Sequence, residues 1–185
     1  MVILASRSPR RREILARAGI AHQVRPADVD ETVRDGEDVA GYVRRLARAK
    51  AEAVSNGPGE VVLGADTVVV VDGEILGKPA DRQDACRMLR RLSGREHEVV
   101  TGICLLTGER AAEDAESTRV RFRSLSEQEI ADYVASGEPM DKAGAYAIQG
   151  LASKFIDRVE GCYFNVVGLP VAKVYARLCE LEAKL

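Results

Sequence analysis

Short apolar runs alternate along the chain with stretches in which apolar residues recur at helical spacing. Residues 2–5 form an apolar run of the length of a buried strand. Ser8 and Pro9 follow it, and they are residue types preferred at the N-cap and the first position of a helix. From residue 39 to 54, apolar side chains recur at helical spacing until the turn-forming residues 56–59. The first third therefore predicts the order strand, helix, loop, helix.

The middle of the chain begins with a predicted hairpin. Residues 61–63 and 68–71 have the apolar, β-branched composition of buried strands. The Asp72-Gly73 pair that follows is the two-residue signal of a hairpin turn. It predicts a return strand at residues 74–76.

A helix and two long strands are predicted next. The helix runs from about residue 81 to 92 and ends at Ser93 and Gly94. Residues 99–106 and 117–122 have strand composition and are joined by a turn.

The last third mixes helices with short strands. Residues 126–129 form a capping box at the start of a helix, and residues 141–150 are rich in small side chains, as in a ligand-facing loop. Residues 155–156 and 166–167 predict two short closing strands, and Pro170 begins a terminal helix. Helices mixed with strands and hairpins indicate an α/β domain around a mixed sheet.

Composition narrows the class of protein. The chain has 185 residues, 46% apolar and 30% charged, which fits one compact domain with a sizeable core. Its formal charge of −2 gives no reason to expect a nucleic acid polymer as partner, although a local basic cluster can hold a small anion. No segment approaches the roughly 20 apolar residues of a membrane span, and the four cysteines are scattered. We expect a cytoplasmic protein with reduced thiols and no membrane partner.

A basic helix start is the first candidate for chemistry. Arg10, Arg11 and Arg12 fall in the first turn of the predicted helix, where the helix dipole disfavours cations. A bound anion reverses this penalty, so residues 6–12 are a candidate phosphate cradle. A solvated basic helix end is the alternative.

Four further charges stand at unusual places. Asp66 directly follows an apolar strand, which suits a ligand of metal or water, and a hydrogen-bonded turn aspartate is the alternative. Lys50 falls on the apolar face of its helix, where it either reaches inward to a phosphate or extends along the helix edge to solvent. Lys78 in a tight loop fits a phosphate contact or a surface charge. Glu31 lies in an acidic loop of the kind that is mostly solvent-exposed.

Missing motifs exclude other chemistries. The chain has no P-loop, no G-x-G-x-x-G and no H-E-x-x-H motif. His22 and His97 are its only histidines, and their spacing to the cysteines fits neither a zinc site nor a histidine-based triad. Carboxylates that hold Mg²⁺ or Mn²⁺ together with phosphates fit the sequence better.

Five segments together resemble the Maf family of nucleoside triphosphate pyrophosphatases and follow that family's order. These segments are Leu4–Leu15, Gly64–Thr67, Leu76–Pro79, Lys142–Gly150 and Asn165–Pro170. The resemblance implies one Maf-like domain over residues 1–185 with an inosine-triphosphate-pyrophosphatase-like fold, which is an elongated mixed α/β sheet flanked by helices, with two lobes and a central cleft. It also implies a homodimer.

The resemblance further implies a reaction, in which a triphosphate is hydrolysed to monophosphate and pyrophosphate with a divalent cation. It makes Asp66 the proton acceptor and a metal ligand, with Glu31 as a second metal-linked carboxylate. The phosphate contacts that it implies are Ser8, Arg11, Arg12, Lys50 and Lys78. The specificity positions that it implies are Arg10, Thr67 and Gln149, which match the branch that acts on dTTP and UTP. The branch that prefers 7-methyl-GTP has a different pattern after the small-residue loop. The Gln149 amide can accept from N3–H and donate to O4 of uracil or thymine.

The resemblance implies removal of modified pyrimidine nucleotides as the cellular role, and two other classes stay open. One is a regulatory binding protein, because the family is also associated with inhibition of septum formation. The other is a phosphatase that removes the terminal phosphate. Product analysis separates these classes.

Overall fold

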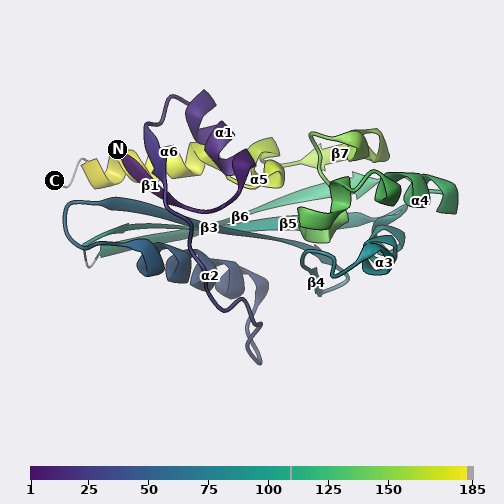
Figure 1. Cartoon of the computed structure of the whole chain (residues 1–185), viewed down its shortest axis with the longest axis horizontal. Helices are drawn as coiled ribbons and strands as arrows, with labels where there is room; N and C mark the ends of the chain where they lie inside the picture. The colour runs from purple at the N-terminus through teal and green to yellow at the C-terminus, as the bar shows by residue number, and fades with distance from the viewer. Residues whose placement is uncertain (109, 183–185) are drawn as a thin grey trace. The chain divides into compact units, whose positions relative to one another are not determined.

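The computed structural model describes residues 1–108 and 110–182. The strands are β1 (Val2–Ala5), β2 (His22–Val24), β3 (Val61–Val71), β4 (Glu74–Leu76), β5 (Glu96–Thr107), β6 (Arg110–Phe122) and β7 (Ile156–Glu160). The α-helices are α1 (Pro9–Arg17), α2 (Val39–Val54), α3 (Arg82–Leu92), α4 (Glu127–Ala135), α5 (Tyr163–Val167) and α6 (Val171–Glu182). Three 3-10 helices are η1 (Glu138–Asp141), η2 (Ala143–Ala145) and η3 (Leu151–Phe155) (Figure 1).

The strands form a mixed sheet, which confirms the predicted α/β class. Hydrogen-bonded neighbours follow the order β2-β1-β3-β5-β6-β7, and β4 pairs with β3. β1 is parallel to both β2 and β3, whereas the β3–β4 and β6–β7 pairs are antiparallel.

The chain divides into two compact units. Unit 1 contains residues 1–67, 101–116 and 168–185, and unit 2 contains residues 68–100 and 117–167. The central cleft and the homodimer stay predictions.

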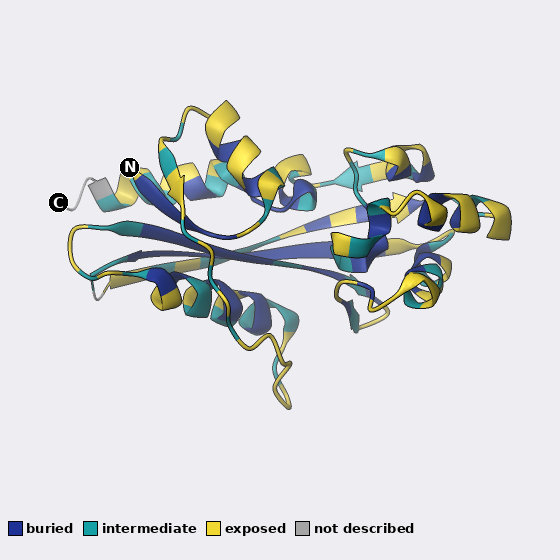
Figure 2. Ribbon diagram, in the orientation of Figure 1, coloured by how far each residue is buried: buried dark blue, intermediate teal, exposed yellow. Residues whose placement is uncertain are grey.

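Two glycines allow α2 to lie directly on the strands of unit 1. A Cβ atom at Gly64 would stand 1.9 Å from the carbonyl oxygen of Ala47, and one at Gly102 would stand 2.3 Å from the carbonyl of Val43. No side chain other than hydrogen fits such contacts. α2 therefore buries one face and exposes the other (Figure 2), while α1 and α6 lie on the opposite side of these strands (Figure 1).

Unit 2 is organised around an aromatic core. Phe122 packs edge-to-face against Tyr146 and His97, with ring centroids 4.9 and 5.1 Å away, and Phe155 is tilted against it. The predicted capping box of α4 is present, because the Ser126 hydroxyl accepts from the Glu129 backbone N–H and the Glu129 carboxylate accepts from the Ser126 N–H.

The β3–β4 hairpin also forms as predicted. Asp72 and Gly73 both adopt positive φ, at 51° and 77°, as a two-residue type I′ hairpin turn requires. The local turn chemistry fixes this part of the fold.

Several sequence predictions need correction. Residues 61–63 and 68–71 belong to one continuous strand, so Asp66 lies within β3 and does not follow a strand. Residues 166–167 end the short helix α5 and are not a strand. The prediction was wrong because an apolar run of two residues is too short to distinguish the spacing of a helix from that of a strand. The last strand begins at Ile156, whereas Phe155 ends η3. β2 was not predicted, since its three residues include two polar ones and it forms by pairing with β1.

Within residues 1–108 and 110–182, every helix falls short of the length and apolar character needed to cross a bilayer.

Candidate functional site

Two carboxylates from different elements of unit 1 meet at one lysine. The ammonium nitrogen of Lys50 lies 2.6 Å from Oδ1 of Asp66 and 2.6 Å from Oε1 of Glu31. The side chains of Lys50 and Asp66 are only 12% and 11% exposed, whereas that of Glu31 is 53% exposed. The site therefore has a buried pair at its floor and a carboxylate at its rim. All three residues were selected from the sequence.

The packing of α2 explains how Lys50 reaches Asp66. Lys50 shares a helix face with the buried residues Leu46, Ala47 and Val54, as its spacing predicted. Because Gly64 has no side chain, α2 lies in contact with β3. The flexible side chain of Lys50 is then long enough to reach Asp66 on that strand. The apolar face is thus the reason that this lysine is drawn inward.

The loop that carries Glu31 is fastened to α2. The hydroxyl of Tyr42 donates to the backbone oxygen of Glu31 at 2.7 Å. Burial, together with the carboxylates of Asp66 and Glu31, raises the pKa of Tyr42 to about 12, so the hydroxyl keeps its proton. Tyr42 is therefore a donor that was not selected from the sequence.

Arg11 is buried and bound to protein oxygens on several sides. Its Nε donates to the Gly168 oxygen at 2.8 Å. Its Nη1 donates to Ser6 Oγ at 3.1 Å and to the Ala65 oxygen at 2.8 Å. Its Nη2 donates to Thr67 Oγ1 at 3.0 Å. Burial lowers the pKa of Arg11, and the nearby Asp66 carboxylate opposes that shift. Four of its five N–H donors are thus engaged within unit 1.

The start of α1 has the features of an anion site. Ser8 is the N-cap without a side-chain capping bond, Pro9 is at the first position, and the first turn holds no acidic residue. Arg12 is exposed and Arg10 is half-buried. First-turn N–H groups have no acceptor inside a helix, so they and Ser8 can bind phosphate oxygens.

Lys78 and Gln149 belong to unit 2. Both are exposed, Lys78 between β4 and α3 and Gln149 in the turn between η2 and η3. The 3-10 helix η2, which precedes the turn of Gln149, is joined to the loop of Lys78 by the Gly144 N–H, which donates to the Gly77 oxygen at 3.0 Å. Gly144 has a φ of 66°, and a Cβ there would lie 2.8 Å from Val69 Cγ2. The small residue is required by both conformation and space.

Tyr133 and Glu138 hold the turn that presents Gln149. The Tyr133 hydroxyl donates to Glu138 Oε1 at 2.9 Å and accepts from the Ala147 N–H at 3.3 Å. Glu138 Oε2 accepts from the Leu151 N–H at 3.1 Å. Residues on both sides of Gln149 are therefore fixed by one tyrosine and one carboxylate. Sequence reasoning missed them, because nothing in their local pattern marks them.

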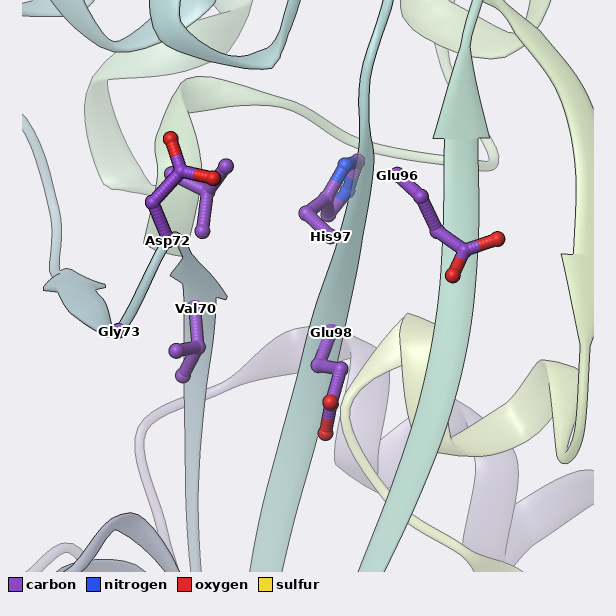
Figure 3. A pocket seen from close by; sticks show the side chains of 7 residues that line it. Val70, Asp72, Gly73, Glu96, His97 and Glu98 are labelled. Carbon is purple, nitrogen blue, oxygen red and sulfur yellow. The ribbon is translucent and has the colours of Figure 1, made fainter.

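A pocket of about 150 Å³ lies in unit 2, between the end of β3 and the start of β5 (Figure 3). Asp72, Glu96 and Glu98 line it, together with His97. Carboxylates repel a triphosphate, so this pocket is a poor candidate for the phosphate cradle. The His97 Nε2 is bonded to the Tyr146 hydroxyl at 2.9 Å, and burial lowers the His97 pKa to about 4, which keeps the ring neutral at pH 7.

The donor set of unit 1 fits a divalent cation that shares its shell with a ligand. Within the described residues, no three or more His, Cys, Asp or Glu side chains are arranged so that they could hold a metal ion by themselves. Glu31 and Asp66 converge on one point, because both contact Lys50 Nζ. Mg²⁺ and Mn²⁺ are commonly held by one or two carboxylates together with waters and phosphate oxygens. Two carboxylates would therefore suffice where waters and phosphate oxygens complete the shell.

Comparison with known proteins identifies the family. The family model described as Maf-like protein matches residues 1–181. A dTTP/UTP pyrophosphatase of Koribacter versatilis (strain Ellin345) is 54% identical over 175 residues, covering 94% of this chain and 91% of that protein. A dTTP/UTP pyrophosphatase of Hahella chejuensis (strain KCTC 2396) is 53% identical over 188 residues, covering 100% and 94%. The chain therefore belongs to the Maf family.

Similar solved structures include the Ham1 protein of Staphylococcus aureus, with a TM-score of 0.46 and 16% identity, covering 65% of this chain and 71% of that one. A nucleoside-triphosphatase, dITP/XTP pyrophosphatase of Mycobacterium abscessus has a TM-score of 0.44 and 15% identity, covering 100% and 97%.

Proposed function

We propose that this chain is a nucleoside triphosphate pyrophosphatase that hydrolyses dTTP and UTP to the monophosphate and pyrophosphate. The observation that carries the proposal is the convergence of Asp66 and Glu31 on Lys50. Its support is membership of a family in which the relatives named above are dTTP/UTP pyrophosphatases. Attack of water on the α-phosphorus expels pyrophosphate as the leaving group.

Asp66 is the proton acceptor in this proposal. Its side chain is shielded from bulk water, and Lys50 binds its Oδ1, so we assign Oδ2 to the attacking water. A carboxylate so placed orients the water and takes its proton. Glu31 and Asp66 would hold Mg²⁺ or Mn²⁺, which when bound neutralises phosphate charge and polarises the phosphoryl oxygens.

The phosphates are assigned to the basic groups. Ser8, Arg12 and the first-turn N–H groups of α1 bind them at one end, and Lys78 contributes a further charge. Lys50, which contacts Glu31 and Asp66, would contact a phosphate oxygen in place of one of these carboxylates when substrate is bound. Positioning and charge neutralisation supply most of the acceleration in reactions of this kind.

The base is assigned to Gln149, with Arg10 and Thr67 as the other specificity positions. Gln149 is exposed in a turn that Tyr133 and Glu138 hold. A held amide can match the N3–H and O4 of uracil or thymine with one acceptor and one donor. We further infer a cytoplasmic homodimer that removes modified pyrimidine nucleotides, and the family membership is the support for this part.

Product analysis with labelled water tests the proposal. The purified chain is incubated with Mg²⁺ or Mn²⁺ and with dTTP, UTP, CTP, GTP or 7-methyl-GTP in H₂¹⁸O. We expect pyrophosphate and a monophosphate that carries the label. Orthophosphate with a diphosphate product would instead identify a terminal phosphatase, and tight binding without turnover would identify a regulatory binding protein.

A further inference from the structure

The Arg11 side chain binds the backbone of β3 next to Asp66, at a point where β3 is no longer paired with β1. The pairing of β1 with β3 ends at the Ala5–Gly64 pair, so β3 continues past residue 64 without β1 as a partner. The backbone oxygen of Ala65, the next residue, accepts from Arg11 Nη1 at 2.8 Å. The guanidinium thus satisfies a strand oxygen that has lost its neighbour in β1.

The same guanidinium contacts the residue on the other side of Asp66. Arg11 Nη2 donates to Thr67 Oγ1 at 3.0 Å, and that hydroxyl is in turn 2.9 Å from Thr101 Oγ1. In a strand, neighbouring side chains point to opposite faces. Arg11 therefore contacts the backbone of Ala65 and the side chain of Thr67, one on each side of Asp66. It leaves the Asp66 carboxylate to the opposite face, where Lys50 binds it.

Arg11 is already committed to the protein. Its bonds to Ser6 and Gly168 join the end of β1 and the start of the segment before α6 to the same guanidinium. Its residue exposure is 9%. A phosphate contact by the engaged donors would break one or more of these bonds, including the side-chain bond to the Ala65 oxygen.

We propose that Arg11 is a positioning residue that fixes Asp66 for proton transfer, and that it is not a phosphate ligand. This inference rests on the proposed function, because it assigns Asp66 to the reaction. It replaces the direct phosphate contact that the family resemblance implied for Arg11. Exposed Arg12, one position along, is left as the arginine that faces the phosphates.

Three variants test the inference with dTTP and Mg²⁺. Arg11→Lys keeps the charge but cannot bridge Ala65 and Thr67, and Ser6→Ala removes one of the four acceptors. Arg17→Lys, on the exposed end of the same helix, is the matched control. The measurements are kcat, KM and the Kd of α,β-methylene-dTTP, with thermal unfolding to confirm the fold.

A positioning role predicts that Arg11→Lys lowers kcat by about 100-fold, since a misplacement on the order of 1 Å at the reacting group costs that much. The Kd of the analogue stays within about fivefold, because no ligand contact is lost. Ser6→Ala lowers kcat by about tenfold in the same way, and it carries the test if Arg11→Lys does not fold. A Kd weakened beyond that limit, or an unchanged kcat, overturns the inference.

Measurements on the wild-type chain show whether a negative result contradicts this inference or the proposed function. If the wild-type chain releases no pyrophosphate, the proposed function fails. Amide hydrogen exchange then still reports on Arg11, because the inference requires faster exchange at Asp66 and Thr67 in Arg11→Lys than in Arg17→Lys. Equal exchange in the two variants overturns it.

Discussion

Lys50 and Asp66 form a buried ion pair with an N–O distance of 2.6 Å between helix α2 and strand β3. Burying two charges is expensive, so a pair of this kind is weak support for stability by itself. The pair is instead the place where the polar chemistry of unit 1 is concentrated, since Glu31 contacts the same ammonium.

Asp66→Asn should keep the fold and lose hydrolysis. The amide is nearly isosteric but cannot take a proton from water, so we expect kcat to fall by at least about 100-fold. Asp132→Asn, at an exposed position of α4, serves as the control. Steady-state turnover of dTTP with Mg²⁺ measures the effect. Turnover within about threefold of wild type would exclude Asp66 as the base.

Lys50→Met should make stability depend on the divalent cation. Without the ammonium, Asp66 and Glu31 both lose their contact with Lys50. We therefore expect the free energy of unfolding in EDTA to fall by about 1–3 kcal/mol, discounted because Glu31 is half exposed. Mg²⁺ or Mn²⁺ replaces the missing positive charge and should restore part of the loss. Urea unfolding in EDTA and in excess cation measures both values. Equal stability in the two conditions would contradict a shared carboxylate site.

Gly64→Ala should damage both stability and activity. Its Cβ would lie 1.9 Å from the Ala47 oxygen, so α2 must move away from β3. Overpacking of this kind costs about 1–3 kcal/mol, and the shift also withdraws Lys50 from Asp66. Gly77→Ala is the control for stability, because its Cβ meets open space and its φ is not positive. Urea unfolding of the two variants gives the comparison, and equal midpoints would show that the helix contact is not tight.

The features that could be predicted from the sequence are those that depend on residues close together along the chain. The Asp72-Gly73 turn, the Ser126 capping box and the inward face of Lys50 each follow from residues within about one or two helical turns. The bonds of Arg11 could not be predicted, because Ala65 and Gly168 lie 54 and 157 positions away along the chain. The turn around Gln149 was visible as a small-residue loop, but its support by Tyr133 and Glu138 depends on packing between helices.

His97 should make unit 2 less stable in mild acid. Its folded pKa is lowered to about 4 by burial, whereas an unfolded histidine titrates near 6.5. The unfolded chain therefore takes up a proton first, and stability is lost as the pH falls from about 6.5 to 4, by about 3 kcal/mol in total. His97→Gln should flatten this slope. Urea unfolding at pH 7, 5.5 and 4.5 measures it, and identical slopes in both proteins would contradict a buried neutral ring.

Specificity should depend on Gln149 and on the rigidity of its turn. Wild-type enzyme should prefer dTTP and UTP over CTP and purine triphosphates, because an imide edge offers N3–H as donor and O4 as acceptor, and cytosine reverses both roles. An amide free to flip would accept cytosine as well, so strong rejection of CTP requires that the turn hold the amide in one orientation. Tyr133 and Glu138 hold the backbone on both sides of it.

Gln149→Glu tests this match directly, because glutamate keeps an acceptor for N3–H but places negative charge against O4. We expect kcat/KM for UTP to fall by about 10- to 100-fold and the UTP to CTP ratio to collapse, since an unpaired polar group at the base is costly. Gln128→Glu, exposed on α4, controls for added charge. Tyr133→Phe removes the donor to Glu138 and leaves Gln149 itself unchanged. It should lower the ratio of kcat/KM for UTP to that for CTP, while α,β-methylene-dTTP still binds. A wild-type preference for 7-methyl-GTP would overturn the dTTP and UTP assignment, and an unchanged ratio in Gln149→Glu would remove Gln149 from the base site.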